Sequence, residues 1–169
     1  MATVETVSAP TELKPYIETD RMEVLRVVIV GLVAGVVVPL LGLAIANGVV
    51  NPVFCHAGQN TFNICASGGV VAYHTSAVIV ALAVVALFAN WSVYRPLPLV
   101  VAATIAMWGF KKYVDPLASG SWPEYYLFSM LLSTLSYLLF YWLLRLRNFP
   151  ASILLTGAAA ALVCWALVA

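Results

Sequence analysis

Two of the three cysteines and one of the two histidines lie in the segment NPVFCHAGQNTFNICASGG, residues 51–69. The thiols of Cys55 and Cys65 can form a disulfide bond, act as a redox pair, or bind a metal ion together with His56. The choice depends on the compartment, because disulfide bonds persist outside the cytosol while thiols stay reduced within it. The chemistry of this segment therefore depends on how the chain crosses a membrane.

A second group of polar residues is predicted to gather at one membrane face. Ionisable residues close to a bilayer are costly and are candidates for function. We predict that six side chains line an external vestibule able to bind a head group, a small ion or a peptide end: His74, Tyr73, Asp115, Glu124, Lys111 and Lys112. The alternative for His74 is a neutral imidazole hydrogen-bonded to a neighbouring helix, and Glu124 also has the spacing of a capping box with Ser121.

The composition indicates a membrane protein. Hydrophobic residues make up 63% of the 169 residues and charged residues 9%, against about 25% charged residues in soluble proteins. The formal net charge is only +1, which is too small for a basic surface that binds nucleic acid. The lipid bilayer is therefore the expected partner, and nucleic acid is not.

Uncharged apolar stretches predict an all-α fold, an integral membrane bundle of five transmembrane helices preceded by a short amphipathic segment. Residues 1–18 are predicted to be a disordered cytoplasmic N-terminus, and residues 19–169 the membrane domain. The third stretch is only 15 residues long and needs flanking cations that reach outward to the interface. The predicted spans are residues 27–50, 68–93, 96–110, 123–144 and 150–168.

The positions of the cations predict the orientation. Loops that face the cytoplasm are enriched in Lys and Arg. With the N-terminus in the cytoplasm of an inner (plasma) membrane, the C-terminus is external, Lys111 and Lys112 lie outside, and six cations lie inside: Lys14, Arg21, Arg26, Arg95, Arg145 and Arg147. A signal-peptidase cleavage after Ala46 is the processing alternative, but the leading segment and the apolar run are long for a signal peptide.

On this topology the segment 51–67 is external, which favours a structural disulfide between Cys55 and Cys65. A bridge across so short a loop contributes about 3 kcal/mol in the chain-entropy picture. A redox role remains as a rival, although the Cys-x-x-Cys pattern typical of thiol oxidoreductases is missing. A metal site with His56 would require a fourth ligand and reduced thiols, so no metal is predicted.

Small and hydroxylated residues predict where the helices pack. Gly31 and Gly35 form a Gly-x-x-x-Gly pattern, and Ser129, Ser133 and Ser136 follow one stripe of the fourth span. Such faces let helices approach closely in lipid, where no hydrophobic force acts between them. We expect packing within the monomer, with contact to a second copy or a partner as the alternative.

Motifs for phosphate binding, nucleophilic catalysis or zinc-dependent proteolysis are missing from the sequence. The sequence therefore favours a non-enzymatic role, as a structural or accessory component of an envelope complex, with no cofactor and with a membrane protein or a second copy as partner. The alternatives are a small transporter or lipid-binding protein that uses the external vestibule, and a membrane thiol-disulfide oxidoreductase.

Overall fold

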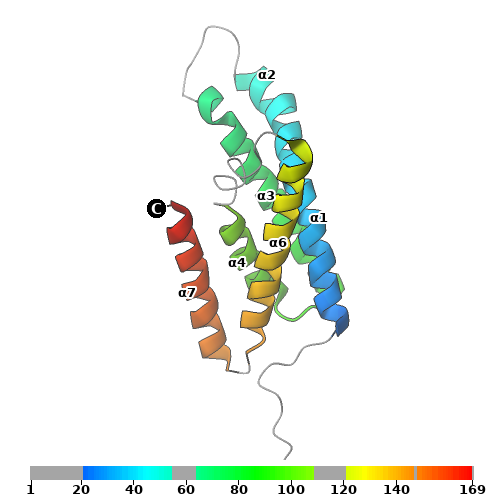
Figure 1. Ribbon diagram of the computed structural model, residues 1–169, viewed down its shortest axis with the longest axis vertical. Coiled ribbons are helices and arrows are strands. Elements are labelled where there is room, and N and C mark those ends of the chain that lie inside the picture. The colour runs from blue at the N-terminus through cyan, green and yellow to red at the C-terminus, as the bar shows by residue number, and fades with distance from the viewer. Residues whose placement is uncertain (1–20, 55–63, 109–120, 147, 169) are drawn as a thin grey trace, which may run out of the picture.

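The computed structural model describes residues 21–54, 64–108, 121–146 and 148–168. These residues form helices joined by short turns (Figure 1). The predicted all-α fold class is confirmed for them. The predicted disordered segment 1–18 lies outside the described residues.

Five apolar helices of more than ten residues make up the described bundle, and successive helices alternate in direction (Figure 1). The first continues through a π-helical turn, η1 (Ala46–Val50), into the short helix α2 (Asn51–Phe54). The five helices are α1 (Arg21–Ile45), α3 (Ile64–Asn90), α4 (Pro96–Trp108), α6 (Trp122–Leu144) and α7 (Phe149–Val168).

Three segments of the described chain are long and apolar enough to cross a membrane: Arg21–Val53, Gly68–Asn90 and Trp122–Leu144. The other two are shorter apolar helices, Pro96–Trp108 and Pro150–Val163. The 13 residues of α4 have a length of about 20 Å, less than the roughly 30 Å of a hydrocarbon core. Helix length and composition thus indicate membrane association and identify α4 and α7 as the shorter partners in the bundle.

The helix boundaries follow proline more closely than they follow charge. Helices α6 and α7 each carry a proline in the first turn, Pro123 and Pro150, where the missing amide hydrogen is not needed. Helix α3 instead begins at Ile64, four residues before the predicted start of the second span at residue 68. Helical hydrogen bonding also continues past residue 50 to Phe54, because uncharged polar residues such as Asn51 do not interrupt it.

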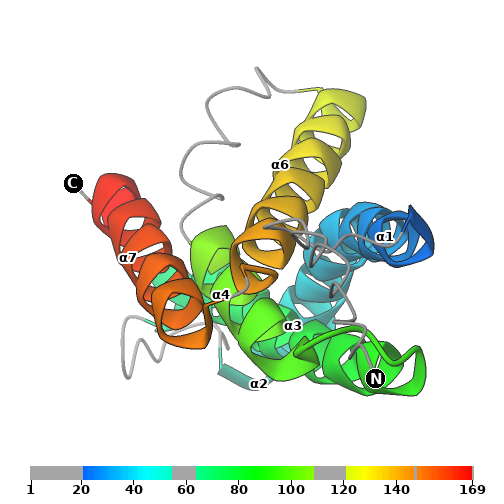
Figure 2. The same cartoon turned by 90° about the horizontal axis from the view of Figure 1, so that it is seen from below.

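Helix α1 packs against α3 and α6, and α4 lies among α3, α6 and α7 (Figure 2). Phe88 of α3 meets Tyr137 of α6 edge to face in the core, with ring centroids 6.2 Å apart. The outer surface is also apolar, since Leu82 is 68% exposed and Leu154 is 72% exposed. Large apolar residues on both the inside and the outside are expected of helices surrounded by lipid.

Candidate functional site

The predicted vestibule is only partly described. His74 of α3 lies edge to face against Trp108 of α4, with centroids 5.3 Å apart, and the adjacent Tyr73 is buried. Glu124 is exposed in the first turn of α6, while Asp115, Lys111 and Lys112 lie outside the described residues. The structure thus places His74 between α3 and α4, and the vestibule remains a prediction.

The expected capping box at the start of α6 does not form through Ser121. This residue is the N-cap, but its side chain makes no capping hydrogen bond. A capping hydroxyl bonds the amide of the second or third helical residue. Of these two, Pro123 has no amide hydrogen, so only the amide of Glu124 is left, and the Ser121 hydroxyl does not bond it. The Ser121 carbonyl instead accepts a hydrogen bond from the amide of Tyr125, at 3.3 Å.

Only one of the two cysteines of the predicted disulfide lies within the described residues. Cys55 lies outside the described residues, as does His56. Cys65 belongs to the first turn of α3, which extends the helix into the segment that was predicted to be a loop. The pairing of Cys55 with Cys65 remains a prediction.

Helices α1 and α6 approach each other closely at two glycines. A Cβ atom added to Gly35 would lie 2.5 Å from the Cα atom of Met130, and one added to Gly31 would lie 2.7 Å from the Cα atom of Thr134. Both distances are shorter than any stable carbon contact. The two glycines therefore set the separation of α1 from α6.

A hydrogen bond crosses the same contact. Pro39 lies inside α1 and has no amide hydrogen to donate to the Gly35 carbonyl one turn earlier. The Ser129 hydroxyl of α6 donates to that carbonyl at 2.7 Å. Neighbouring serines commonly satisfy carbonyls freed by proline in membrane helices. We call Gly35, Pro39 and Ser129 the proline lock.

Other serines make contacts between two further helix pairs, α1 with α3 and α4 with α6. The buried Ser76 hydroxyl of α3 lies 2.9 Å from the Val38 carbonyl of α1 and 2.7 Å from its own Tyr73 carbonyl. On α6, Ser133 contacts the Met107 sulfur atom at 3.6 Å and Ser136 the Ala103 carbonyl at 3.4 Å. The serine stripe of α6 therefore divides, with Ser129 facing α1 and the other two facing α4.

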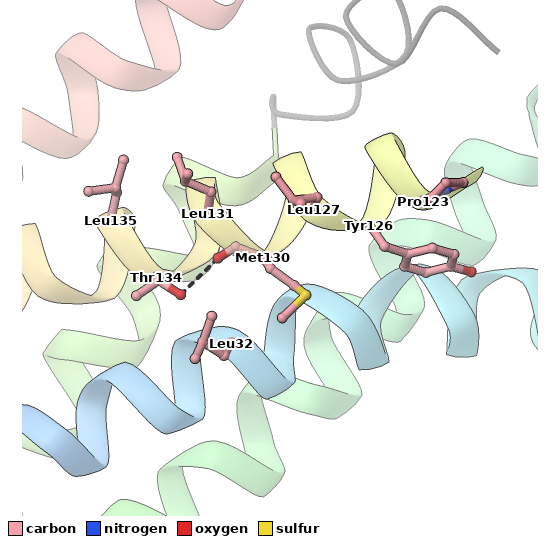
Figure 3. Close-up of a pocket in the computed structure, with 8 residues that line it drawn as sticks. All are labelled: Leu32, Pro123, Tyr126, Leu127, Met130, Leu131, Thr134 and Leu135. Atoms are coloured by element: carbon pink, nitrogen blue, oxygen red, sulfur yellow. Dashed lines mark hydrogen bonds between the residues drawn. The ribbon is translucent and has the colours of Figure 1, made fainter. Parts of the chain in front are cut away.

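An open groove of about 490 Å³ runs along α6 beside α1 (Figure 3). Its lining is almost wholly apolar, and Met130 lies at its centre in the close-up (Figure 3). The Thr134 hydroxyl in the groove bonds the Met130 carbonyl of its own helix at 2.8 Å. The groove thus offers shape and apolar surface, but little polar chemistry.

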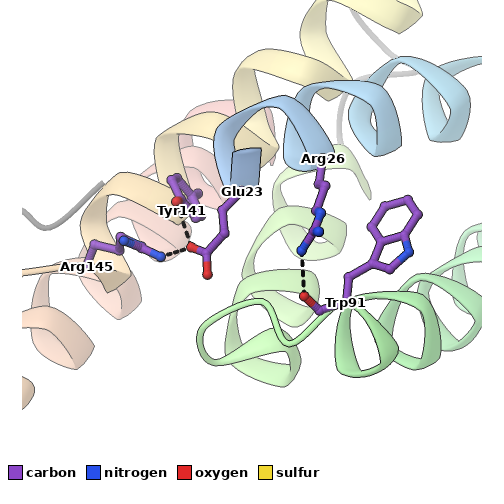
Figure 4. A network of polar contacts seen from close by, with 5 residues as sticks. All are labelled: Glu23, Arg26, Trp91, Tyr141 and Arg145. Atoms are coloured by element: carbon purple, nitrogen blue, oxygen red, sulfur yellow. Dashed lines mark hydrogen bonds and ion pairs between the residues drawn. The ribbon is translucent and has the colours of Figure 1, made fainter. Parts of the chain in front are cut away.

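A charged cluster joins the helices at the end of the bundle where α1 begins (Figure 4). Glu23 of α1 forms an ion pair with Arg145, which directly follows α6. The Tyr141 hydroxyl donates to the same Glu23 oxygen at 3.0 Å. The two charged side chains are only 16% and 11% exposed, so their attraction is screened less than that of a surface pair.

Two more arginines cap helix ends beside this ion pair. Arg26 donates to the Trp91 carbonyl just after α3, at 2.8 Å, and Arg95 to the Leu144 carbonyl at the end of α6, at 3.4 Å. The last carbonyls of a helix have no partner within the helix, and cations favour that end of the helix dipole. We call Glu23, Arg26, Arg95 and Arg145 the arginine cluster.

Tyr94 brings two members of the arginine cluster together. Its ring centroid lies 4.5 Å from the Cζ atom of Arg95 and 5.9 Å from that of Arg145. The turn that carries Tyr94 is strained, because Ser92 and Arg95 have positive φ angles of 55° and 50°. Such angles are unfavourable for residues other than glycine and persist where surrounding contacts hold them.

The sequence interpretation placed Arg26, Arg95 and Arg145 on one side of the membrane, but it did not find their partners. Glu23, the partner of Arg145, was not among the predicted site residues. Its position in the first turn, on the side where cations gather, was the available signal for an ion pair. The choice of Arg145 depends on how α1 and α6 are aligned, which a single sequence does not specify.

The chain was also compared with known proteins. No family model matches it, and no curated protein or solved structure was found to be similar.

Proposed function

We propose that this chain is a five-span inner-membrane protein that serves as a non-enzymatic accessory or structural component of an envelope complex. In this proposal α4 and α7 cross the bilayer alongside the three longer helices. The support is their packing, since α4 contacts α3, α6 and α7 within the bundle. Short helices cross by local bilayer thinning and by flanking side chains that reach the interface.

The orientation in this proposal has the N-terminus in the cytoplasm and the C-terminus outside. It is supported by the arginine cluster, because Arg26, Arg95 and Arg145 come from three distant parts of the sequence and meet at one end of the bundle. A concentration of arginine at one end is typical of the cytoplasmic side.

The observation that carries the accessory role is the proline lock. Transport by alternating access moves one group of helices against another around the binding site. Here the close contact at Gly35 and the hydrogen bond from Ser129 fix α1 against α6 in the middle of the bundle. A fixed bundle with an apolar outer surface supports a component that holds a position in an assembly more than one that moves a substrate.

The experiment is purification of the chain at native expression in mild detergent, followed by mass determination of the intact particle. We expect a particle heavier than the 18.2 kDa chain, with one companion at a fixed ratio. A G35L variant, which breaks the close contact, is expected to lose the companion. A G157L variant, at an exposed position where an added Cβ atom meets nothing within 4 Å, is expected to keep it. Isolation of the wild-type chain as a monomer would overturn the accessory role.

A further inference from the structure

The groove along α6 has two sides and a floor. Leu127, Leu131 and Leu135 form one ridge of α6, because side chains four residues apart share a helix face. Leu32 of α1 lies opposite this ridge, and Met130 lies between the two sides (Figure 3). We call this surface the α6 groove. A ligand in it touches protein on more than one side.

The contact of α1 with α6 keeps the α6 groove open. Gly31 and Gly35 bring the backbone of α1 against the backbones of Thr134 and Met130, two of the residues that line the groove. Because the two backbones already touch along this line, α1 cannot move closer to α6 to close the groove. Its shape is therefore fixed by the same glycines that fix the helix pair.

The chemistry of the α6 groove favours an apolar ligand. Among the described residues that line it, none is charged. The Thr134 hydroxyl is engaged with the Met130 carbonyl of its own helix, at 2.8 Å. A polar ligand would give up its hydration without gaining hydrogen bonds in return, which is costly. The groove thus suits a hydrocarbon chain.

The length of the α6 groove matches one leaflet of a bilayer. From Pro123 to Leu135 the helix rises about 18 Å, and half of the hydrocarbon core is about 15 Å thick. At the Pro123 end, Trp122 is 65% exposed and stacks on Tyr126, with ring centroids 6.3 Å apart. Such aromatic residues lie at the level of lipid head groups. The groove therefore runs from the head-group level to about the middle of the bilayer, as an acyl chain does.

A partner helix fits the α6 groove less well. A transmembrane helix crosses both leaflets, whereas the groove ends at Leu135 and α6 continues to Leu144. Membrane helices also associate through small residues. Ser129 and Ser133, the small residues on this part of α6, are engaged with α1 and α4. The remaining surface of leucine and the adaptable Met130 suits a flexible chain.

We propose that the α6 groove holds one acyl chain of a phospholipid from the leaflet in which α6 begins, more tightly than the open helix faces hold lipid. The added strength comes from contact on two sides, since single dispersion contacts are weak and act through their number. The inference rests on the proposed membrane placement, but not on the accessory role.

The test uses the full chain in a neutral detergent, with a phosphatidylcholine that carries a photoreactive diazirine at the end of one acyl chain. Mass spectrometry of the cross-linked peptides is the measurement. We expect saturable labelling of α6 near Leu135 and of α1 near Leu32. The reference is Leu82, which is 68% exposed in the middle of α3 and does not line the groove. Labelling in the groove is expected to exceed labelling near Leu82 about fivefold, which corresponds to about 1 kcal/mol.

Two variants change the α6 groove in opposite ways. L32W fills it from α1, and L131A removes part of the ridge on α6. Both are expected to lower the labelling of α6 to the level found near residue 82 of α3. The matched controls are L82W and L82A, which make the same changes on an open helix face and are expected to leave labelling of the groove unchanged. If L32W does not fold by circular dichroism, L131A at an exposed position gives the same test.

Three results would overturn the inference. These are equal labelling of the α6 groove and of α3 near Leu82, an equal loss of groove labelling in L82W and L32W, or a strong preference for one head group. The last is tested with phosphatidylglycerol that carries the same diazirine chain, which is expected to label the groove as well as phosphatidylcholine does. Failure of the membrane placement would look different, because the chain would then be released from membranes by alkaline carbonate without detergent.

Discussion

At the scale of single residues, the described bundle depends on hydroxyl groups that reach carbonyls on neighbouring helices. The Ser129 hydroxyl donates a hydrogen bond to the Gly35 carbonyl, which Pro39 leaves without an amide donor. The Ser76 hydroxyl donates to the carbonyl of Val38, one residue before the same proline. Hydrogen bonds between membrane helices contribute modestly, about 0.6 kcal/mol on average. The proline lock should exceed this average, because a buried carbonyl without a donor is costly.

The first prediction tests the coupling within the proline lock. S129A is expected to destabilise the chain by about 1 kcal/mol, measured as the free energy of unfolding in detergent micelles. In a P39A background, Ala at position 39 supplies the missing amide hydrogen, so the same S129A change is expected to cost much less. Equal costs in both backgrounds would show that Ser129 does not act through the carbonyl freed by Pro39.

The control for that cycle is T75A. The Thr75 hydroxyl is exposed and bonds the Val71 carbonyl of its own helix at 2.9 Å. That carbonyl is also within reach of the Thr75 amide in a regular helix, so T75A is expected to change stability little in either background.

The second prediction concerns the turn between α3 and α4. Ser92 has a φ angle of 55°, which costs a residue other than glycine about 1–2 kcal/mol. S92G is therefore expected to raise the free energy of unfolding, by up to about 1 kcal/mol after the entropy of the added glycine is subtracted. A decrease in stability would mean that the Ser92 side chain makes a contact worth more than the backbone strain.

At the scale of helices, the two contacts of α1 with α6 differ in kind. In the middle of the bundle, glycine allows the backbones to touch. At the end, the ion pair of Glu23 with Arg145 ties the first turn of α1 to the residue after α6. The first contact fixes the distance between the helices, and the second fixes their alignment along the axis.

The third prediction compares two glycines. G35A places a Cβ atom against the backbone of Met130, and such overpacking is expected to destabilise the chain by about 1–3 kcal/mol. G157A on α7 meets nothing within 4 Å and is expected to be neutral or stabilising, because alanine is the better helix former. Thermal unfolding in detergent measures both, and a G35A protein as stable as wild type would contradict the close contact.

The fourth prediction tests the ion pair by removal of its negative charge. E23Q leaves the Arg145 guanidinium without its carboxylate in a largely buried position and is expected to destabilise the chain by more than 1 kcal/mol. E124Q removes an exposed carboxylate from the first turn of α6 and is the comparison variant, with a smaller expected change because exposed charge pairs contribute at most about 1 kcal/mol.

The double variant E23R/R145E restores opposite charges across the same contact. It is expected to recover part of the stability that the single variants E23R and R145E each lose. The interaction energy from the double-mutant cycle of these three variants measures the recovery. A double variant as unstable as the two single losses added together would show that the pair does not couple α1 to α6.

At the scale of the whole molecule, the all-helical class and most helix positions could be predicted from the sequence. The start of α6 and of α7 followed from Pro123 and Pro150, which act locally. The ends of α1 and α3 were misplaced, because hydropathy reports where charges stop and not where helical hydrogen bonding stops. Local signals were therefore reliable where a proline defined the boundary.

The contacts between helices could be predicted only as faces, not as pairs. Gly35 and Ser129 were both expected to lie in helix contacts, but their bond joins residues 94 positions apart. Such a bond depends on which helices are neighbours and how they are aligned, and neither is encoded in local patterns. The vestibule and the disulfide stay predictions, since Asp115 and Cys55 lie outside the described residues.

The central claim is that the chain crosses the bilayer five times, with the arginine cluster on the cytoplasmic side. The most direct measurement is a pair of reporters fused after Ala169, alkaline phosphatase and green fluorescent protein, since the first is active only outside the cytoplasm and the second fluoresces only inside. The account predicts an active phosphatase and a dark fluorescent protein. A fluorescent fusion with inactive phosphatase would place the C-terminus in the cytoplasm and contradict the five crossings.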